Sequence, residues 1–200
     1  EHGNLDQSLM PNLSPDDIRT MYWFMNLSRL LNSKILNLQK QGRIGTYASI
    51  YGQEGGEVAL AYAMRDFQNV WIAPSFRETA VMIARGVPMD QIMRYWGGYE
   101  IGSKIPKEMR ILPVCIPIGT QLNHAVGLAM AMNITNEKGV AVAMFGDGGT
   151  SEGESMEAMN FAGAFNAPVI FFCQNNQYAI SVPRKKQSAA HTLAQKAMAF

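Results

Sequence analysis

One stretch, residues 140–181, constrains the fold of this 200-residue chain more than any other part of it. It begins with six apolar residues and is then broken by the run Gly146-Asp147-Gly148-Gly149. A helical pattern follows, and a second apolar run ends at Asn175-Asn176. This order of patterns predicts a strand, a glycine-rich turn, a helix and a second strand.

A right-handed crossover returns the second strand parallel to the first, so both strands end at the same edge of the sheet. We therefore expect Asp147 and Asn176 to lie close together, although 29 positions separate them. The N–H groups of a glycine-rich turn can face a ligand, and the helix behind the turn adds the positive end of its dipole. Magnesium that also holds phosphate accepts a carboxylate and an amide oxygen. The sequence predicts a magnesium diphosphate site at this edge.

Composition favours one ordinary globular protein. Hydrophobic residues make up 48% of the chain, charged residues 16%, and the formal net charge is +1. Basic residues cluster only at Arg184-Lys185-Lys186 and no apolar run approaches the length of a membrane span, so we expect neither nucleic acid nor a membrane as a partner. Cys115 and Cys173 lack CxxC spacing and are predicted to be buried thiols. With no signal or transit pattern at the start, the expected location is cytoplasmic.

Residues 1–13 are predicted to form an irregular arm and residues 14–200 a single α/β domain. Ser14, Pro15 and the two acids after them are a strong start for a helix that continues to Gly42. Further predicted elements are a helix at 57–64, a strand at 70–73, a helix that starts within 74–78 and ends at 85–86, and helices at 88–96 and 121–132.

Three side chains each leave two interpretations open. Arg77 follows a strand and opens a helix, so it could grip a phosphate by two N–H bonds or form a surface salt bridge with Glu78 or Asp66. Glu54 could be a functional acid, but an acid in the first turn of a helix more often serves the helix dipole. His124 by itself more often indicates a packed structural histidine than a catalyst.

The stretch from Gly146 to Ser181 resembles the thiamine-diphosphate motif, in which GDG is followed further along the chain by NN. More narrowly, the chain resembles the alpha subunit of the first component of 2-oxo acid dehydrogenases, the pyruvate and branched-chain 2-oxo acid dehydrogenase family. The likeness extends through the segments QGRIGTYASIYGQEGGEVALAYAM, APSFRE, IPIGTQLNHAVGLAMA and SVPRKKQ. It covers nearly everything after Ser14.

The resemblance implies a thiamine-diphosphate-binding α/β fold, with a mostly parallel sheet, helices on both faces and the ligand at the carboxyl ends of the strands. It also implies magnesium ligands. These would be the side chains of Asp147 and Asn176 and the main-chain carbonyl of Tyr178.

Further cofactor-binding positions follow from the same resemblance. They are Phe76, Arg77, Gly148 and Gly149 around the diphosphate and Ile116 and Ile118 around the organic part. The backbone of both isoleucines would contact the aminopyrimidine, and the Ile118 side chain would wedge the cofactor into a bent shape. Phe76 stands where many relatives carry tyrosine, so one hydroxyl contact to the diphosphate is missing.

Other departures from the family pattern concern ions. Gln174 stands where some members have a phosphate-binding arginine, which weakens that half of the anion site. Thr120 and Gln121 correspond to a monovalent-cation loop in some members, but Cys115 replaces a hydroxyl residue there, so no potassium is expected. Candidate neighbours of the substrate are Tyr47, Tyr51, Ser75 and Ile118.

The implied reaction is decarboxylation of a small 2-oxo acid, pyruvate or a branched-chain acid, with transfer of the acyl group to a lipoyl carrier. The implied partners are a beta subunit, in a tetramer of two alpha and two beta chains, and a lipoyl-bearing acyltransferase core. No residue of this chain is a convincing catalyst, and the general-acid glutamate is expected from the beta subunit. Family subunits continue past the position of Phe200, so their C-terminal part, with a histidine-bearing loop, is expected to be missing here.

Two alternatives remain. Gly146-x-Gly148-x-x-Ser151 after a strand resembles a dinucleotide-binding fingerprint, although serine replaces the third glycine and no acid follows where the motif needs one. A single-chain thiamine enzyme, which would need no beta subunit, is the other.

Overall fold

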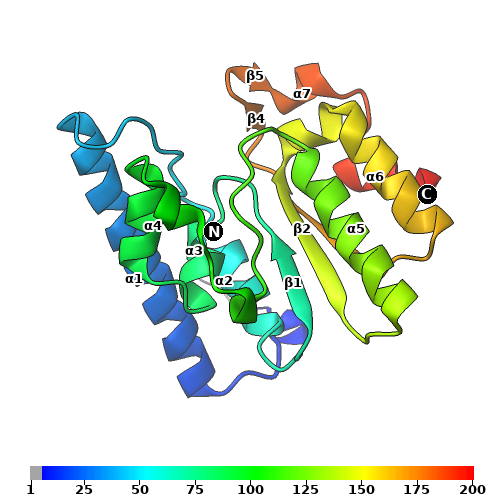
Figure 1. The fold of residues 1–200 in the computed structure, drawn as a ribbon, viewed down its shortest axis with the longest axis horizontal. Helices are drawn as coiled ribbons and strands as arrows, with labels where there is room; N and C mark the ends of the chain where they lie inside the picture. Colours follow the sequence, from blue (N-terminus) through cyan, green and yellow to red (C-terminus); the bar gives the residue numbers. More distant parts are fainter. Residues whose placement is uncertain (1–5) are drawn as a thin grey trace.

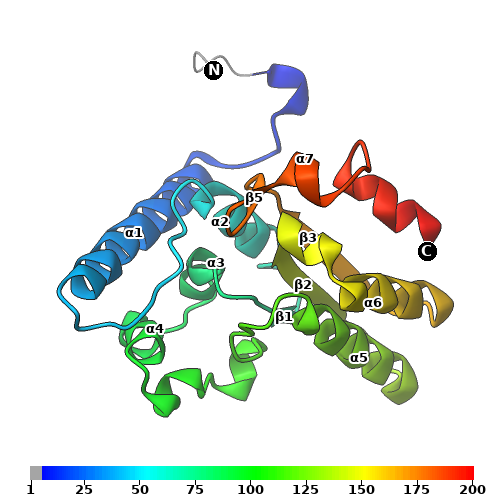
Figure 2. The same ribbon diagram turned by 90° about the horizontal axis from the view of Figure 1, so that it is seen from above.

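Three parallel strands form the sheet on which the chain is built. In the computed structural model, which describes residues 6–200, β1 (Val70–Ala73), β2 (Val140–Gly146) and β3 (Val169–Gln174) lie in the order β1-β2-β3. Figure 1 shows β1 beside β2, and Figure 2 labels all three strands. Val70 pairs with Val140, and Gly146 pairs with Gln174. The predicted strand, turn, helix and parallel strand are confirmed, and all three strands end at one edge.

Helices fill most of the remaining chain. The α-helices are α1 (Pro15–Lys40), α2 (Glu54–Ala63), α3 (Thr79–Ala84), α4 (Met89–Trp96), α5 (Thr120–Thr135), α6 (Gly153–Ala164) and α7 (Arg184–Gln187). Short 3-10 turns are η1 (Gln7–Leu9), η2 (Glu100–Ser103), η3 (Lys107–Met109), η4 (Asp147–Ser151) and η5 (Leu193–Ala199), and β4 (Tyr178–Ala179) pairs with β5 (Val182–Pro183) as an antiparallel hairpin. The helix predicted to start within residues 74–78 begins only at Thr79, because residues 74–78 form an irregular segment after β1.

The two faces of the sheet belong to two hydrophobic cores, because successive strand residues point to opposite faces. Val142 and Met144 pack in the core that α1, α2, α3 and α4 cover. Ala141, Ala143 and Phe145 pack in the core of α5 and α6. Figure 2 shows these two groups of helices on opposite sides of the strands. The predicted α/β architecture with helices on both faces is confirmed.

The start of α1 has the predicted cap. The Ser14 side chain accepts a hydrogen bond from the Asp17 N–H at 3.1 Å, and the Asp17 carboxylate accepts one from the Ser14 N–H at 2.8 Å. These two bonds satisfy backbone donors that a helix leaves open. The buried stripe of α1 contains Leu31, Ile35 and Leu38 but also the polar residues Ser28 and Asn32.

Two expectations about burial are wrong. His124 is exposed, because α5 turns Leu122, Ala125 and neighbouring apolar residues to the sheet and His124 lies outside that stripe. Cys115 and Cys173 are half-buried instead of buried. Burial still raises the pKa of the Cys173 thiol to about 11, so the thiol form dominates.

The predicted arm at residues 1–13 contains η1, and its first five positions lie outside the described residues. No helix within residues 6–200 combines the length and the apolar character needed to cross a membrane.

The central sheet gives a direct test of the packing. Ile72 is completely buried in β1, so Ile72→Ala should leave a cavity and lower the free energy of unfolding by about 2–5 kcal/mol. Ile134 is 78% exposed, and Ile134→Ala should change stability by no more than about 0.5 kcal/mol. Chemical denaturation of both variants checks this. Equal effects of the two substitutions would contradict the assigned core.

Candidate functional site

A pocket of about 410 Å³ opens at the carboxyl ends of the three strands. The segment after β1 contributes residues 75–78, the segment after β2 contributes Gly148 and Gly149, and the segment after β3 contributes Asn176 and Tyr178. Ligand sites in proteins commonly measure about 300–1,000 Å³. The structure thus brings segments that are far apart in sequence to one site of ligand size.

Asp147 is the one buried carboxylate of the turn after β2, with 1% of its surface exposed. Its Oδ2 accepts a hydrogen bond from Gln187 Nε2 at 3.4 Å, but its Oδ1 is buried without any hydrogen-bond partner in the described chain. Leaving a charged oxygen buried and unpaired costs free energy. A cation beside Oδ1 would remove that cost. Among residues 6–200, no three His, Cys, Asp or Glu side chains gather as a metal-binding cluster.

Close contacts limit the space for a side chain at two glycines of the turn. A Cβ atom at Gly148 would lie 2.7 Å from the Cβ of Ala179 in β4, and one at Gly149 would lie 3.2 Å from Phe145 Cδ2. Only glycine at position 148 lets the turn lie against the β4 hairpin. One detail of the prediction differs: Gly148 and Gly149 lie within η4 (Asp147–Ser151), and α6 begins only at Gly153, so α6 does not begin directly behind the glycines.

Asn176 and Tyr178 lie in one tight turn. The Asn176 Oδ1 accepts a hydrogen bond from the Tyr178 N–H at 3.1 Å. An amide oxygen has two lone pairs, so this bond leaves one free. Both residues line the pocket together with Gly148, as expected from the parallel pairing of β2 and β3.

Arg77 is half-buried and lines the pocket. Its Nη1 donates to the main-chain oxygen of Ser49 at 2.5 Å, and its guanidinium carbon lies 5.6 Å from the centre of the Phe76 ring. Within the described residues it forms no ion pair with Glu78, and Asp66 pairs with Arg65. The interpretation of Arg77 as a surface salt bridge is therefore wrong.

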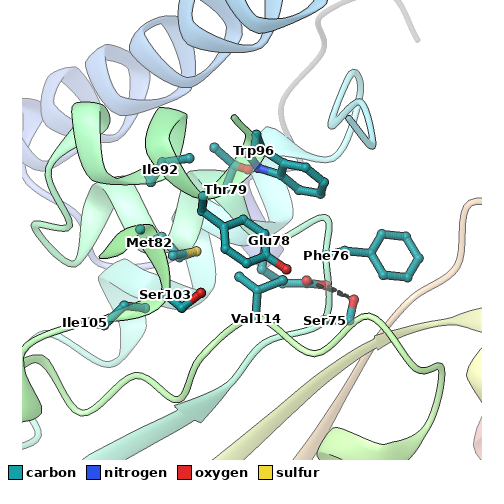
Figure 3. A pocket seen from close by; sticks show the side chains of 12 residues that line it. Ser75, Phe76, Glu78, Thr79, Met82, Ile92, Trp96, Ser103, Ile105 and Val114 are labelled. Carbon is teal, nitrogen blue, oxygen red and sulfur yellow. Dashed lines mark hydrogen bonds between the residues drawn. The ribbon is translucent and has the colours of Figure 1, made fainter. Parts of the chain in front are cut away.

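Glu78 is the acid that lines this pocket, and hydrogen bonds surround it. Ser75 Oγ donates to Oε2 at 2.9 Å and to Oε1 at 3.1 Å, the Arg77 N–H donates to Oε2 at 2.9 Å, and Gln174 Nε2 donates to Oε1 at 3.4 Å. Burial nevertheless raises its pKa above the ordinary glutamate value. Figure 3 shows the Ser75 and Glu78 side chains pointing toward each other. They also line a second cavity of about 10 Å³, room for about one water molecule.

A second buried acid, Glu57, was missed by sequence reasoning. It is completely buried in α2, and its Oε2 accepts the N–H groups of Ala80 at 2.8 Å and Val81 at 3.2 Å, while Oε1 has no partner in the described chain. Burial raises the pKa of Glu57 well above the ordinary value, and the charge of Glu78 adds to this. A second acid one turn after Glu54 was the only signal in the sequence, and its position resembles that of a helix-dipole residue.

Glu54 links α1 to the segment that precedes α2. Its carboxylate is 2% exposed, pairs with Arg29 of α1 at 2.9 Å and accepts the Gly52 N–H at 2.9 Å. These contacts hold the segment before α2 against α1. Neither the functional interpretation nor the dipole alone describes it.

The remaining predicted site residues divide into two groups. Ile118 and Ser75 line the pocket at the strand ends, as does Phe76. Ile116 is 51% exposed and does not line it. Of the other candidate neighbours of a substrate, Tyr47 is buried against Trp96 and Tyr51 is exposed, and neither reaches the pocket.

Comparison with known proteins gives a consistent result. The sequence pattern of the dehydrogenase E1 component family matches residues 22–200. The chain is 40% identical over 195 residues to the pyruvate dehydrogenase E1 component subunit alpha of Bacillus cereus, covering 98% of this chain and 52% of that protein. It is 42% identical over 196 residues to the protein of the same name from Acholeplasma laidlawii, covering 98% and 56%. With the 3-methyl-2-oxobutanoate dehydrogenase subunit alpha of Mycobacterium tuberculosis it shares 40% over 189 residues, covering 94% and 51%. The chain spans about half the length of the curated relatives it matches.

The raised pKa of Glu57 predicts a pH dependence of stability. The unfolded chain ionises this acid near the ordinary value of 4.5, whereas the folded chain keeps its proton to higher pH. Its contribution to stability is therefore full below pH 4.5 and is lost as the pH rises through the folded pKa. Glu57→Gln cannot ionise, and its amide oxygen can still accept the two N–H groups.

The free energy of unfolding would be measured by denaturation between pH 4.5 and 8. It should fall less for Glu57→Gln than for the wild type, by about 1.4 kcal/mol for each unit by which the folded pKa of Glu57 exceeds its unfolded pKa. Glu137 is exposed, so Glu137→Gln serves as the control and should follow the wild type. Parallel curves for all three proteins would show that Glu57 is not held neutral.

Proposed function

The chain belongs to the dehydrogenase E1 component family, and we propose that it is the alpha subunit of a thiamine-diphosphate-dependent 2-oxo acid dehydrogenase, binding the magnesium diphosphate half of the cofactor. One observation carries this proposal: the unpartnered Oδ1 of Asp147 belongs to the glycine turn whose Gly148 and Gly149 line the pocket, and Arg77 lines the same pocket. A buried anion, backbone donors and a guanidinium are together the groups that a metal diphosphate requires.

The residues present fit a magnesium ion that is shared with a diphosphate. Asp147 would supply a carboxylate oxygen, Asn176 its amide oxygen and Tyr178 its main-chain carbonyl. Magnesium accepts such a small set of protein oxygens when phosphate and water complete its shell. Gly148 and Gly149 would offer backbone N–H groups to the diphosphate, where no side chain obstructs the approach.

The organic part of the cofactor would lie toward Ile118 and Phe76, which line the same pocket. Ile116 lies outside the pocket lining, so for this residue we propose backbone contacts alone. When bound, thiamine diphosphate supplies the carbanion chemistry that no amino-acid side chain provides. The chain itself would bind the diphosphate, orient the ring system through Ile118 and exclude water with its apolar lining.

The substrate would be a small 2-oxo acid, pyruvate or a branched-chain acid, which loses carbon dioxide before its acyl group passes to a lipoyl carrier. Ser75 and Ile118 are the candidate neighbours of that substrate in this chain, since both line the pocket. Names of relatives in both substrate classes support this range without separating its members.

A beta subunit would complete the site, in a tetramer of two alpha and two beta chains that works with a lipoyl-bearing acyltransferase core. The state of Glu78 supports this division. Among the described residues it is the carboxylate that lines the pocket, and Ser75, Arg77 and Gln174 already occupy both of its oxygens. The general-acid glutamate would therefore come from the partner chain.

A dinucleotide-binding module is the weaker alternative. Ser151 replaces the third glycine of that fingerprint, and β3 ends at Gln174 followed by two asparagines, without the acid that would hold a ribose.

Activity with and without the partner tests the proposed function. The chain would be produced alone and together with its beta subunit, and decarboxylation of pyruvate and of 3-methyl-2-oxobutanoate measured with an artificial electron acceptor. We expect turnover only for the combined chains, dependent on added thiamine diphosphate and magnesium. Robust turnover by the chain alone would indicate a single-chain thiamine enzyme. No turnover of any 2-oxo acid by the combined chains would refute the function.

The metal assignment has its own test. Asp147→Ala removes the charged magnesium ligand, so the affinity of the combined chains for thiamine diphosphate with magnesium should fall at least a hundredfold, about 2.7 kcal/mol. Calorimetric titration measures this affinity. Asp90 is an exposed acid on α4, and Asp90→Ala should bind like the wild type. Undiminished affinity in Asp147→Ala would refute the assignment.

A further inference from the structure

We propose that Asn32 of α1 is a positioning residue for Arg77: acting through Ser49, it sets the direction in which the guanidinium faces a diphosphate in the pocket. The inference rests on the proposed function, because it assumes that the pocket binds a diphosphate. It concerns a residue that does not line the pocket and that no motif of the sequence singles out.

The contacts of Asn32 are unusual for the middle of a helix. Its side chain is completely buried in the otherwise mostly apolar stripe of α1. Its Oδ1 accepts the Ile50 N–H at 3.0 Å and the Ser49 hydroxyl at 3.2 Å, while its Nδ2 has no partner in the described chain. Burying a side-chain amide costs free energy unless hydrogen bonds inside the protein replace those it made to water. The two hydrogen bonds from residues 49 and 50 to Oδ1 therefore offset the cost of burying the Asn32 side chain.

Ser49 connects this anchor to the pocket. Its main-chain oxygen accepts a hydrogen bond from Arg77 Nη1, the residue that lines the pocket from the segment after β1. A guanidinium carries five N–H groups in one plane. A hydrogen bond to one of them restricts the rotation of the guanidinium, so the remaining donors point in a narrower range of directions. A guanidinium that is already held loses less side-chain entropy on binding a diphosphate than one that is free to rotate.

The segment 49–54 has other anchors, so its fold does not depend on Asn32 alone. Ile50 is completely buried against Val58 and Ala80, and Glu54 pairs with Arg29 of α1. Loss of the Asn32 acceptor should therefore make the position of the Ser49 carbonyl less fixed, while the Ile50 side chain stays packed against Val58 and Ala80. This separation makes a positioning role distinguishable from a purely structural one.

The first test compares three substitutions in α1. Asn32→Leu removes the acceptor at similar size, whereas Asn32→Asp keeps an acceptor oxygen, with the proton that burial favours on the oxygen that replaces the unpartnered Nδ2. Ser28→Ala is the matched control, because Ser28 is equally buried but, within the described residues, its hydroxyl bonds only the Phe24 oxygen of its own helix.

Titration of thiamine diphosphate with magnesium into the combined alpha and beta chains gives the dissociation constant of each variant. We expect the chains with Asn32→Leu to bind the cofactor about tenfold more weakly, because Arg77 is less preorganised. A tenfold change corresponds to about 1.4 kcal/mol. Asn32→Asp and Ser28→Ala should bind within about twofold of the wild type. Ser49→Ala removes one of the two bonds to Asn32 and, as a milder second variant, should weaken binding in the same direction.

A double-mutant cycle decides whether Asn32 acts through Arg77. In the Arg77→Met background, Asn32→Leu should have no further effect on the dissociation constant, because the group it positions is gone. The same tenfold loss in both backgrounds, or unchanged binding in Asn32→Leu, would overturn the positioning role while leaving the proposed function intact. Absence of binding by the wild-type chains would instead refute the proposed function and this inference with it.

Discussion

The parallel pairing of β2 with β3 is the constraint on which the rest of the site depends. Gly146 lies opposite Gln174, so the segments that follow the two strands leave the sheet side by side. A shift of one residue would turn Val142 and Met144 toward α5 and α6 and send Ala141 and Ala143 to the other core. Hydrophobic burial on both faces thus holds the register, and the register brings the GDG turn and the asparagine turn to one pocket.

The partners of each buried acid near this edge decide how readily it ionises. Glu54 is ionised by its pair with Arg29, which together with hydrogen bonds lowers its pKa against the effect of burial. Glu57 lacks a cation and has its pKa raised, and Glu78 is surrounded by donors from Ser75, Arg77 and Gln174. Among the acids of residues 6–200, Asp147 alone combines deep burial with an unpaired oxygen in the glycine turn. That difference is why we propose Asp147, and not one of the three glutamates, as the metal ligand.

Sequence reasoning predicted the elements better than the contacts between them. The periodicity of residues 140–181 was sufficient for β2, α6 and β3, and the Ser14 cap was sufficient for the start of α1. Burial of single polar residues was less predictable. Glu57 and Asn32 lie in helices whose patterns do not reveal which polar position faces the core, and His124 was expected inside and is exposed. Such burial depends on packing between helices far apart in sequence, which local patterns do not contain.

The position of the metal tests the central claim most directly. Crystals of the combined alpha and beta chains with thiamine diphosphate and manganese in place of magnesium would locate the ion by its anomalous scattering. The account predicts a peak about 2.1 Å from Asp147 Oδ1, the distance of a magnesium-type oxygen ligand, with Asn176 on the same ion. A peak at Glu57 or Glu78, or a diphosphate bound away from the turn at Gly148, would contradict it.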